Sequence, residues 1–177
     1  TDSRVVMKIK RPHIDDDIQR SFSYVYQLFW LLTKLHLVEF NDKLDKVKES
    51  LMKQTDFVKE LEELCRFHEI YKNSTNIRIP APYTSLSNEN IITQEFLPGG
   101  MITDLKTLEQ VEHVARSLWD FSFQSAFIEG CWHADLHKGN VICMMESDMD
   151  PTPKLGIIDF GITGSFKGFE KSIVLNY

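Results

Sequence analysis

The stretch "WHADLHKGNVI" (residues 132–142) places two histidines, an aspartate, a lysine and an asparagine between apolar segments. Polar side chains in such surroundings need hydrogen-bonding partners or a ligand. A second apolar stretch ends in "IIDFG" (residues 157–161), and a hairpin between the two stretches would bring Asn140 and Asp159 together. The spacing of these two residues and Asp135 matches the template of phosphoryl-transfer sites.

That template gives each side chain a role. Asp135 would orient or deprotonate the acceptor hydroxyl, whereas Asn140 and Asp159 would hold a metal ion beside the nucleotide phosphates. Carboxylate and amide oxygens are suitable ligands for Mg²⁺, so we expect ATP and Mg²⁺ as cofactors. Lys138 is a candidate for nucleotide binding, with a solvated surface lysine as the alternative.

A cation for the phosphates and an acid to hold that cation are expected in the N-terminal part of the chain. Lys8 lies in the β-rich run "RVVMKIK" and fits the strand lysine of the kinase template, with an exposed edge-strand lysine as the alternative. A helix is predicted to begin at Thr55 or Asp56. Glu60 lies at the edge of the apolar stripe of this helix and is the acid best placed to hold Lys8. The alternative is a solvated helix residue.

The segment Glu95-Phe96-Leu97 follows a predicted strand and occupies the expected linker between two lobes. Backbone groups of this linker would bind an adenine ring. An ordinary strand end is the alternative.

The histidines of the central stretch have two interpretations each. His133 is expected to brace the loop by hydrogen bonds, and His137 either contacts phosphate or braces the loop as well. A zinc site is disfavoured because it would leave Asp135 and Asn140 without a purpose and fits no common zinc module. Such a site would use Cys131, His133, His137 and Cys143.

The rest of the chain reads as a mixture of helices and short strands. The expected elements are a strand at 4–10, helical pieces over 14–72 with breaks near 41–43 and 53–56, short strands over 76–100, a long helix from Thr103 or Asp104 to Gly130, and two strands at 140–145 and 154–161. Core packing is the expected role of the apolar residues in the long helix.

Composition restricts the class of partner. A net charge of −6 over 177 residues does not favour nucleic-acid binding, because a phosphate-tracking surface normally carries a basic excess. Three widely spaced cysteines predict reduced thiols in an intracellular reducing compartment. The N-terminal segment has no signal-peptide core.

The apolar run "YVYQLFWLL" (residues 24–32) is too short to span a bilayer and predicts a helix buried against a core. Contact with a lipid or membrane surface is the alternative.

Five segments of the chain resemble, in the same order, those of the UbiB family of atypical kinases, also called aarF-domain proteins. The strand lysine of that family, followed by Arg-Pro-Gly, resembles Lys8 with Arg11-Pro12, and its His-Ala-Asp-Pro-His-Pro-Gly-Asn loop is similar to residues 133–140. Inserted helices between the strand lysine and the helix glutamate are a trait of the family. The segments are "VVMKIKRPHI", "TDFVKELEELCRF", "IITQEFLPGG", "GCWHADLHKGNVI" and "LGIIDFGITG".

The resemblance implies a fold, an activity and a location. The fold is an α+β, protein-kinase-like two-lobe fold, with a small antiparallel sheet lobe over residues 1–100 and part of a helical lobe with the catalytic hairpin over 101–177. The implied activity is Mg-dependent phosphoryl transfer or ATP hydrolysis in lipid or coenzyme Q metabolism. A mitochondrial or other organellar location follows if the chain behaves like the family, and a cytoplasmic one otherwise.

Several positions depart from the family pattern. Gln54 and Glu63 replace the family's Glu and Asn, while Leu136 and Lys138 replace two prolines. The family's Lys-x-Gly-Gln segment and nucleotide loop would precede residue 1, and "SFKGFEKSIVLNY" (165–177) resembles the start of a helical bundle. We therefore expect a chain truncated at both ends.

Three functions remain open at this point. The first is a UbiB-type kinase or ATPase. The second is a pseudokinase or scaffold, favoured by the missing nucleotide loop. The third is a phosphotransferase resembling aminoglycoside or choline kinases, which Leu136 favours and the glycine of "DFG" disfavours.

Overall fold

The computed structural model describes residues 4–37, 43–147 and 150–166. The first half contains β1 (Val5–Ile9), α1 (Ile14–Lys34), α2 (Lys43–Gln54), α3 (Phe57–Tyr71), β2 (Ile77–Arg78) and β3 (Ile91–Glu95). The second half contains β4 (Gly100–Met101), α4 (Leu108–Phe123), β5 (Cys131–His133), β6 (Val141–Met144), β7 (Lys154–Ile157) and β8 (Thr163–Ser165). This mixture of helices and small sheets confirms the α+β class. The expected bundle start lies, from residue 167 onward, outside the described residues, as does most of the break expected at 41–43.

Within the described ranges, the strands form three small sheets. β1 pairs antiparallel with β3, and this register places Lys8 opposite Ile92. In the four-stranded sheet β2-β7-β6-β4, β6 and β7 form the expected antiparallel hairpin, whereas β2 pairs parallel with β7. β5 pairs antiparallel with β8 and so joins the chain before the hairpin to the chain after it. The division of the chain into two lobes at residue 100 stays a prediction. The β2–β7 ladder pairs a strand before residue 100 with a strand after it.

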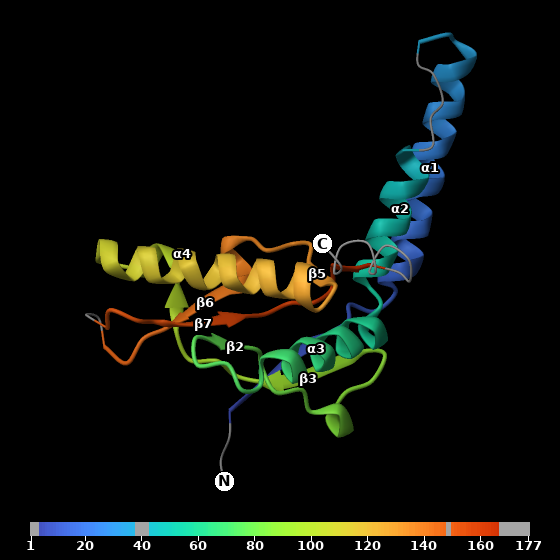
Figure 1. Cartoon of the computed structure of the whole chain (residues 1–177). Coiled ribbons are helices and arrows are strands. Elements are labelled where there is room, and N and C mark those ends of the chain that lie inside the picture. The colour runs from blue at the N-terminus through green and yellow to red at the C-terminus, as the bar shows by residue number, and fades with distance from the viewer. Residues whose placement is uncertain (1–3, 38–42, 148–149, 167–177) are drawn as a thin grey trace.

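The hydrophobic core lies where α3 and α4 pack against the strands (Figure 1). Phe67 of α3 is fully buried, and its ring centroid lies 4.9 Å from that of Phe160 and 6.0 Å from that of Phe121. Tyr71 adds a fourth ring, 5.2 Å from Phe121, and its hydroxyl donates to the Phe121 carbonyl at 3.0 Å. Because Phe160 follows Asp159 directly, the core anchors one side of the predicted metal-binding segment.

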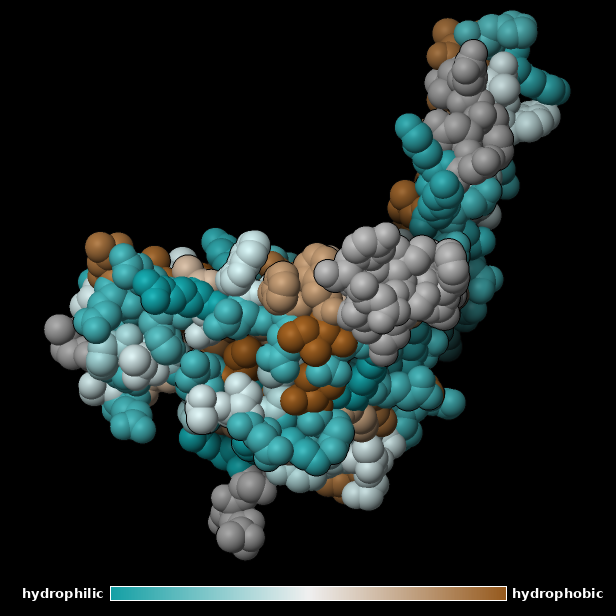
Figure 2. Space-filling model, in the orientation of Figure 1, coloured by the Kyte–Doolittle hydropathy of each residue, from teal (hydrophilic) through white to brown (hydrophobic). Residues whose placement is uncertain are grey.

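α1 and α2 form a hairpin that projects away from this core (Figure 1). Residues 24–32 are helical as predicted, but their burial against a core is wrong: none of the residues of α1, all of them within the described range, is buried. Tyr24, Leu28 and Leu31 of α1 are about half to two-thirds exposed. Figure 2 shows apolar residues among the hydrophilic ones along the hairpin. Among the described residues, no helix has the length and apolar character needed to cross a membrane.

The base of the hairpin is tied to the body at both ends. Asp15, in the first turn of α1, accepts hydrogen bonds from Lys10 Nζ at 2.8 Å and from Thr55 Oγ1 at 2.6 Å. Lys10 follows β1, and Thr55 lies between α2 and α3. One carboxylate therefore holds together the points where the chain leaves the body and returns to it.

The long helix expected from residue 103 to 130 is shorter. α4 begins at Leu108 because Thr107 is the N-cap: its hydroxyl accepts from the Gln110 N–H, and the Gln110 side chain accepts from the Thr107 N–H, both at 3.2 Å. A 3-10 turn over Ile102–Asp104 precedes it, and a π-helical turn over Gln124–Ile128 follows. Gly130, with φ 69°, ends the segment as expected.

Core packing is also only part of the role of this helix. Val114 and Phe121 are buried, but Leu108 is 74% and Trp119 70% exposed.

Candidate active site

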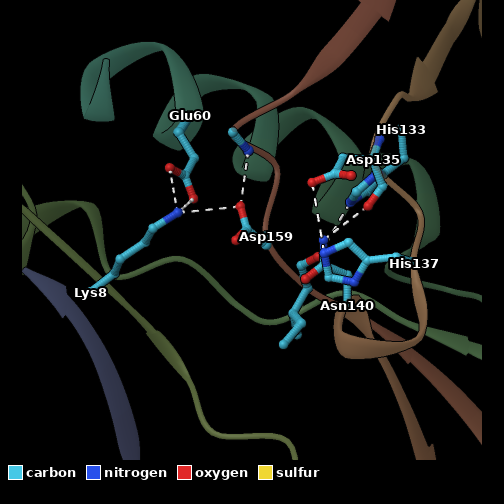
Figure 3. Close-up of polar contacts among 9 residues, drawn as sticks. Lys8, Glu60, His133, Asp135, His137, Asn140 and Asp159 are labelled. Atoms are coloured by element: carbon cyan, nitrogen blue, oxygen red, sulfur yellow. Dashed lines mark hydrogen bonds and ion pairs between the residues drawn. The ribbon is translucent and has the colours of Figure 1, made fainter. Parts of the chain in front are cut away.

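Lys8 and two acids from distant parts of the chain meet at one point (Figure 3). Lys8 Nζ lies 2.8 and 2.9 Å from the two carboxylate oxygens of Glu60 and 3.2 Å from Oδ1 of Asp159. The three residues come from β1, α3 and the segment after β7. The expected approach of Lys8, Glu60 and Asp159 is therefore present.

Local structure explains why Glu60 points inward. Asp56 caps α3, accepting a hydrogen bond from the Lys59 N–H at 3.1 Å, as the sequence predicts for Thr55 or Asp56. The buried face of α3 then carries Phe57, Glu60 and Leu64. Glu60 is 5% exposed, so its carboxylate needs a partner, which Lys8 supplies. The alternative of a solvated Glu60 is wrong.

Burial acts oppositely on the two partners of this ion pair, but the net pKa of each is raised. Burial raises the pKa of Glu60, the hydrogen bond and charge of Lys8 oppose this, and Asp159 adds to it. Burial lowers the pKa of Lys8, but the hydrogen bonds and charges of Glu60 and Asp159 outweigh burial, so the net pKa of Lys8 is raised. Burial acts in opposite directions on the two groups because it disfavours the charged form, which is the deprotonated form of Glu60 and the protonated form of Lys8. Lys8 therefore stays an ammonium, and Glu60 is the member of the pair that can gain a proton as the pH falls.

The backbone around Asp159 has an unusual conformation. Asp159 has a φ of 63°, a left-handed value that is uncommon for a residue other than glycine and is typical of functional sites. Its Oδ1 accepts a hydrogen bond from the Gly161 N–H at 3.3 Å. A Cβ at position 161 would lie 3.3 Å from Oδ1 of Asp159 and 3.4 Å from Oε2 of Glu60. Glycine thus lets the chain pass close to both carboxylates.

The loop after β5 is held to this segment by hydrogen bonds. Asn140 Nδ2 donates to the Asp135 carbonyl at 2.9 Å, and the Ile158 N–H donates to the Asn140 carbonyl at 3.0 Å. The side chain of Asp135 is 46% exposed, so its carboxylate is accessible to a ligand. The predicted hairpin therefore brings Asn140 and Asp159 to the same end of β6 and β7.

His133 braces this arrangement. It is 8% exposed, its Nε2 lies 3.3 Å from the Ile158 carbonyl, and its Nδ1 accepts from the Asp135 N–H at 3.2 Å. Burial lowers the pKa of His133, although the backbone of Ile158 and Asp159 and nearby carboxylates oppose this. A neutral, hydrogen-bonded ring agrees with the role of a structural brace.

The predicted linker has side chains engaged in structural contacts. Glu95 accepts two hydrogen bonds from Arg78 Nη2, at 2.8 and 2.9 Å, and one from the Ala81 N–H at 3.0 Å. The Phe96 ring lies 4.7 Å from the Arg4 guanidinium, and Leu97 is buried. The N–H groups of residues 95 and 96 donate to the carbonyls of Ala81 and Arg4. Adenine binding by residues 95–97 stays a prediction, as does nucleotide binding by Lys138, which is exposed beside Gly139.

Sequence reasoning missed Arg78, which holds Glu95, and the depth at which Phe160 is buried. The alternation of Ile77, Arg78 and Ile79, apolar on either side of a cation, is the signal that could have indicated a strand with Arg78 on its other face.

The donor set agrees with Mg²⁺ as the metal. Among the described residues, no group of three or more His, Cys, Asp or Glu side chains is placed to hold a metal ion. Asn140 uses its Nδ2 to donate to the loop, which leaves the amide oxygen as a ligand, and the Asp159 carboxylate is 45% exposed. Mg²⁺ commonly takes one or two protein oxygens and completes its shell with phosphate and water.

All three cysteines, Cys65, Cys131 and Cys143, lie in the described ranges and form no disulfide.

Comparison with known proteins gives consistent matches. The ABC1 atypical kinase-like domain matches residues 1–176. The chain is 27% identical over 150 residues to the "Probable serine/threonine-protein kinase abkC" of Dictyostelium discoideum, covering 81% of the chain and 22% of that protein. It is 25% identical to the "Probable protein kinase UbiB" of Histophilus somni and 24% identical to the "AarF domain-containing protein kinase 1" of Xenopus tropicalis. These matches cover 96% and 90% of the chain, and 32% and 31% of the relatives. The chain thus spans about a third or less of their length.

A solved structure shows the same fold. The Rv3197–erythromycin complex from Mycobacterium tuberculosis superposes with a TM-score of 0.77 at 21% sequence identity. The match covers 96% of this chain and 41% of the other. At this identity the likeness describes the fold alone.

Proposed function

Because the chain belongs to the ABC1 atypical kinase-like family, we propose that it binds ATP with Mg²⁺ and transfers or hydrolyses the terminal phosphoryl group. The observation that carries this proposal is the cluster of Lys8, Glu60 and Asp159, which joins residues up to 151 positions apart at hydrogen-bonding distance. A lysine held between two carboxylates is the arrangement that a phosphate-binding cation needs, because the acids fix its position.

The proposed roles follow from the contacts. Lys8 would bind the nucleotide phosphates, and Glu60, its bidentate partner, would hold it in place. Asp135, exposed and fixed through its backbone by Asn140, would accept or orient the proton of the attacking hydroxyl or water. The amide oxygen of Asn140 and the carboxylate of Asp159 would hold Mg²⁺, which offsets phosphate charge when bound.

The test is Mg-dependent ATP turnover by the intact protein. We expect Asp135→Asn and Asp159→Asn to reduce turnover by about 100-fold or more, because each removes a charged group from the transition state. Asp120→Asn is the matched control, since Asp120 is exposed on α4 and should leave turnover unchanged. Nucleotide affinity is measured in parallel by calorimetry.

Other outcomes would favour the other functions. Nucleotide binding without turnover would indicate a pseudokinase or scaffold. Transfer of phosphate to a soluble hydroxylated small molecule would indicate a phosphotransferase of the aminoglycoside or choline kinase type. The link to coenzyme Q or lipid metabolism and the cellular location stay predictions.

A lipid surface is the partner that we propose for the hairpin, because α1 exposes apolar side chains. The hairpin carries Lys34, Lys46 and Lys48 together with acidic residues such as Asp45 and Glu49, so its charge is mixed. An apolar face with adjacent lysines is typical of helices that lie at a membrane interface. The exposed apolar residues of α1 are Tyr24, Leu28, Trp30 and Leu31, and Leu35 at its C-cap is exposed as well.

Sedimentation with vesicles tests this contact. We expect binding to phosphatidylcholine vesicles that contain phosphatidylserine, and its loss in the double variant Leu28→Gln and Leu31→Gln. Leu108→Gln on α4, at a residue 74% exposed, is the control. Equal binding of all three proteins would exclude the hairpin as the contact.

A further inference from the structure

His137 and Lys138 are the polar side chains of the loop 134–140 to which the proposed roles give no task. Its Nδ1 accepts a hydrogen bond from the Gly139 N–H at 3.0 Å, and its side chain is 58% exposed. A Cβ at position 139 would lie 3.0 Å from Cε1 and 3.1 Å from Nδ1 of the ring. Glycine therefore allows the ring to lie against the backbone, which fixes its orientation.

This hydrogen bond determines where the ring proton lies. A ring nitrogen that accepts a hydrogen bond carries no proton, so the neutral imidazole of His137 is protonated on Nε2. Nε2 lies 3.8 Å from Oδ2 of Asp135 (Figure 3). That separation is longer than a hydrogen bond, and catalytic contacts of this kind tighten when the substrate is bound.

The two oxygens of Asp135 differ in their surroundings. Oδ2 faces the Nε2–H of His137, whereas Oδ1 has no hydrogen-bond partner among the described residues. His133, the other histidine of the loop, contacts the backbone N–H of Asp135 and not its carboxylate. Among the described residues, His137 is therefore the side chain whose donor lies within 4 Å of this carboxylate.

We infer that His137 is a positioning residue for Asp135. The Nε2–H holds Oδ2, and Oδ1 is then turned toward the hydroxyl or water that attacks the phosphoryl group. The inference rests on the proposed function, because it assumes that Asp135 takes part in phosphoryl transfer. It adds a residue and a tautomer that this function does not require.

Two variants separate the two hydrogen bonds of the ring. The amide of His137→Gln reaches the position of Nε2 and keeps a donor toward Asp135, but loses the acceptor for the Gly139 N–H. The oxygen of His137→Asn takes the position of Nδ1 and keeps that acceptor, but loses the donor. We expect the Asn variant to lose about tenfold or more in kcat with an unchanged KM for ATP, and the Gln variant to stay within about threefold of the parent.

The opposite order would show that His137 braces the loop and would overturn the inference. Equal losses in the two variants, or no loss in either, would overturn it as well. Thermal unfolding of each variant identifies any loss of folded protein, and variants of the exposed His13 serve as matched controls.

A spectroscopic measurement keeps the inference testable even if the protein shows no turnover. ¹⁵N spectra of the imidazole should show His137 protonated at Nε2 and not at Nδ1. The ¹³C resonance of the Asp135 carboxyl should shift in His137→Asn and change little in His137→Gln. Absence of turnover in the parent would contradict the proposed function, whereas the wrong tautomer, or a carboxyl unaffected by either variant, would contradict the positioning role alone.

Discussion

Two helices of this chain, α1 and α3, have apolar residues at helical spacing and opposite surroundings. α3 buries Phe57, Glu60, Leu64, Phe67 and Tyr71 within 15 residues, whereas α1, over 21 residues, buries none. Periodicity predicts that a helix has an apolar face, but it does not identify what covers that face. The difference also separates two tasks, because the helix with the buried face carries a residue of the candidate active site.

The largest effect is expected from truncating the aromatic core under that site. Phe67→Ala should lower the free energy of unfolding by about 3–5 kcal/mol, because it removes a fully buried ring that contacts Phe121 and Phe160. Urea unfolding followed by circular dichroism measures the change. A loss below about 1 kcal/mol would show that α3 depends on its core no more than α1 does.

A smaller effect on stability and a large one on activity are expected at Glu60. Glu60→Gln keeps the volume of the side chain but removes the charge that holds Lys8. Stability should change by less than about 1 kcal/mol, because Lys8 is 41% exposed and keeps Asp159 as a partner. ATP turnover should fall by about tenfold or more, since small displacements of a phosphate-binding group are costly. Turnover equal to that of the parent would show that Glu60 has no role in the candidate active site.

The pH dependence of stability should reveal the ion pair between Arg78 and Glu95, which lies beside the predicted linker. Burial raises the pKa of Glu95, but hydrogen bonds from Arg78 and Ala81 outweigh it, so the net pKa lies below the usual 4.5. A lowered pKa in the folded state contributes stability above about pH 4.5 that is lost as the pH falls through the folded value. Glu95→Gln should therefore flatten the acid side of the stability curve, by less than about 1 kcal/mol because Arg78 and Glu95 are 38% and 25% exposed. Unfolding midpoints at pH 7 and pH 4 measure this, and parallel curves for the two proteins would contradict it.

The smallest effect is expected in the hairpin. Leu28→Ala should change the free energy of unfolding by less than about 0.5 kcal/mol, because the side chain is already 55% exposed. Denaturant unfolding, run beside Phe67→Ala, completes the comparison. A loss of 2 kcal/mol or more would show that another surface covers Leu28 in solution.

The sequence predicts the site better than it predicts the helices that surround it. The positions of Asp135, Asn140 and Asp159 follow from short-range spacing on one hairpin, which the β6–β7 ladder enforces. The approach of Glu60 to Lys8 follows from a helix face and a template. The exposure of residues 24–32 could not be predicted, because it depends on whether another element lies opposite. The predicted start of α4 is too early, because the Thr107–Gln110 capping box, which is visible in the sequence, places the N-cap at Thr107.

The carboxylate of Asp15 has a mechanical consequence. Since it binds Lys10 on one side and Thr55 on the other, the two ends of the hairpin meet at one joint. A force applied to the tip of the hairpin is therefore passed to the body at this joint. Lys10 lies two residues from Lys8, and Thr55 lies five residues from Glu60. A force on the hairpin would therefore reach the Lys8–Glu60 ion pair through very little intervening chain.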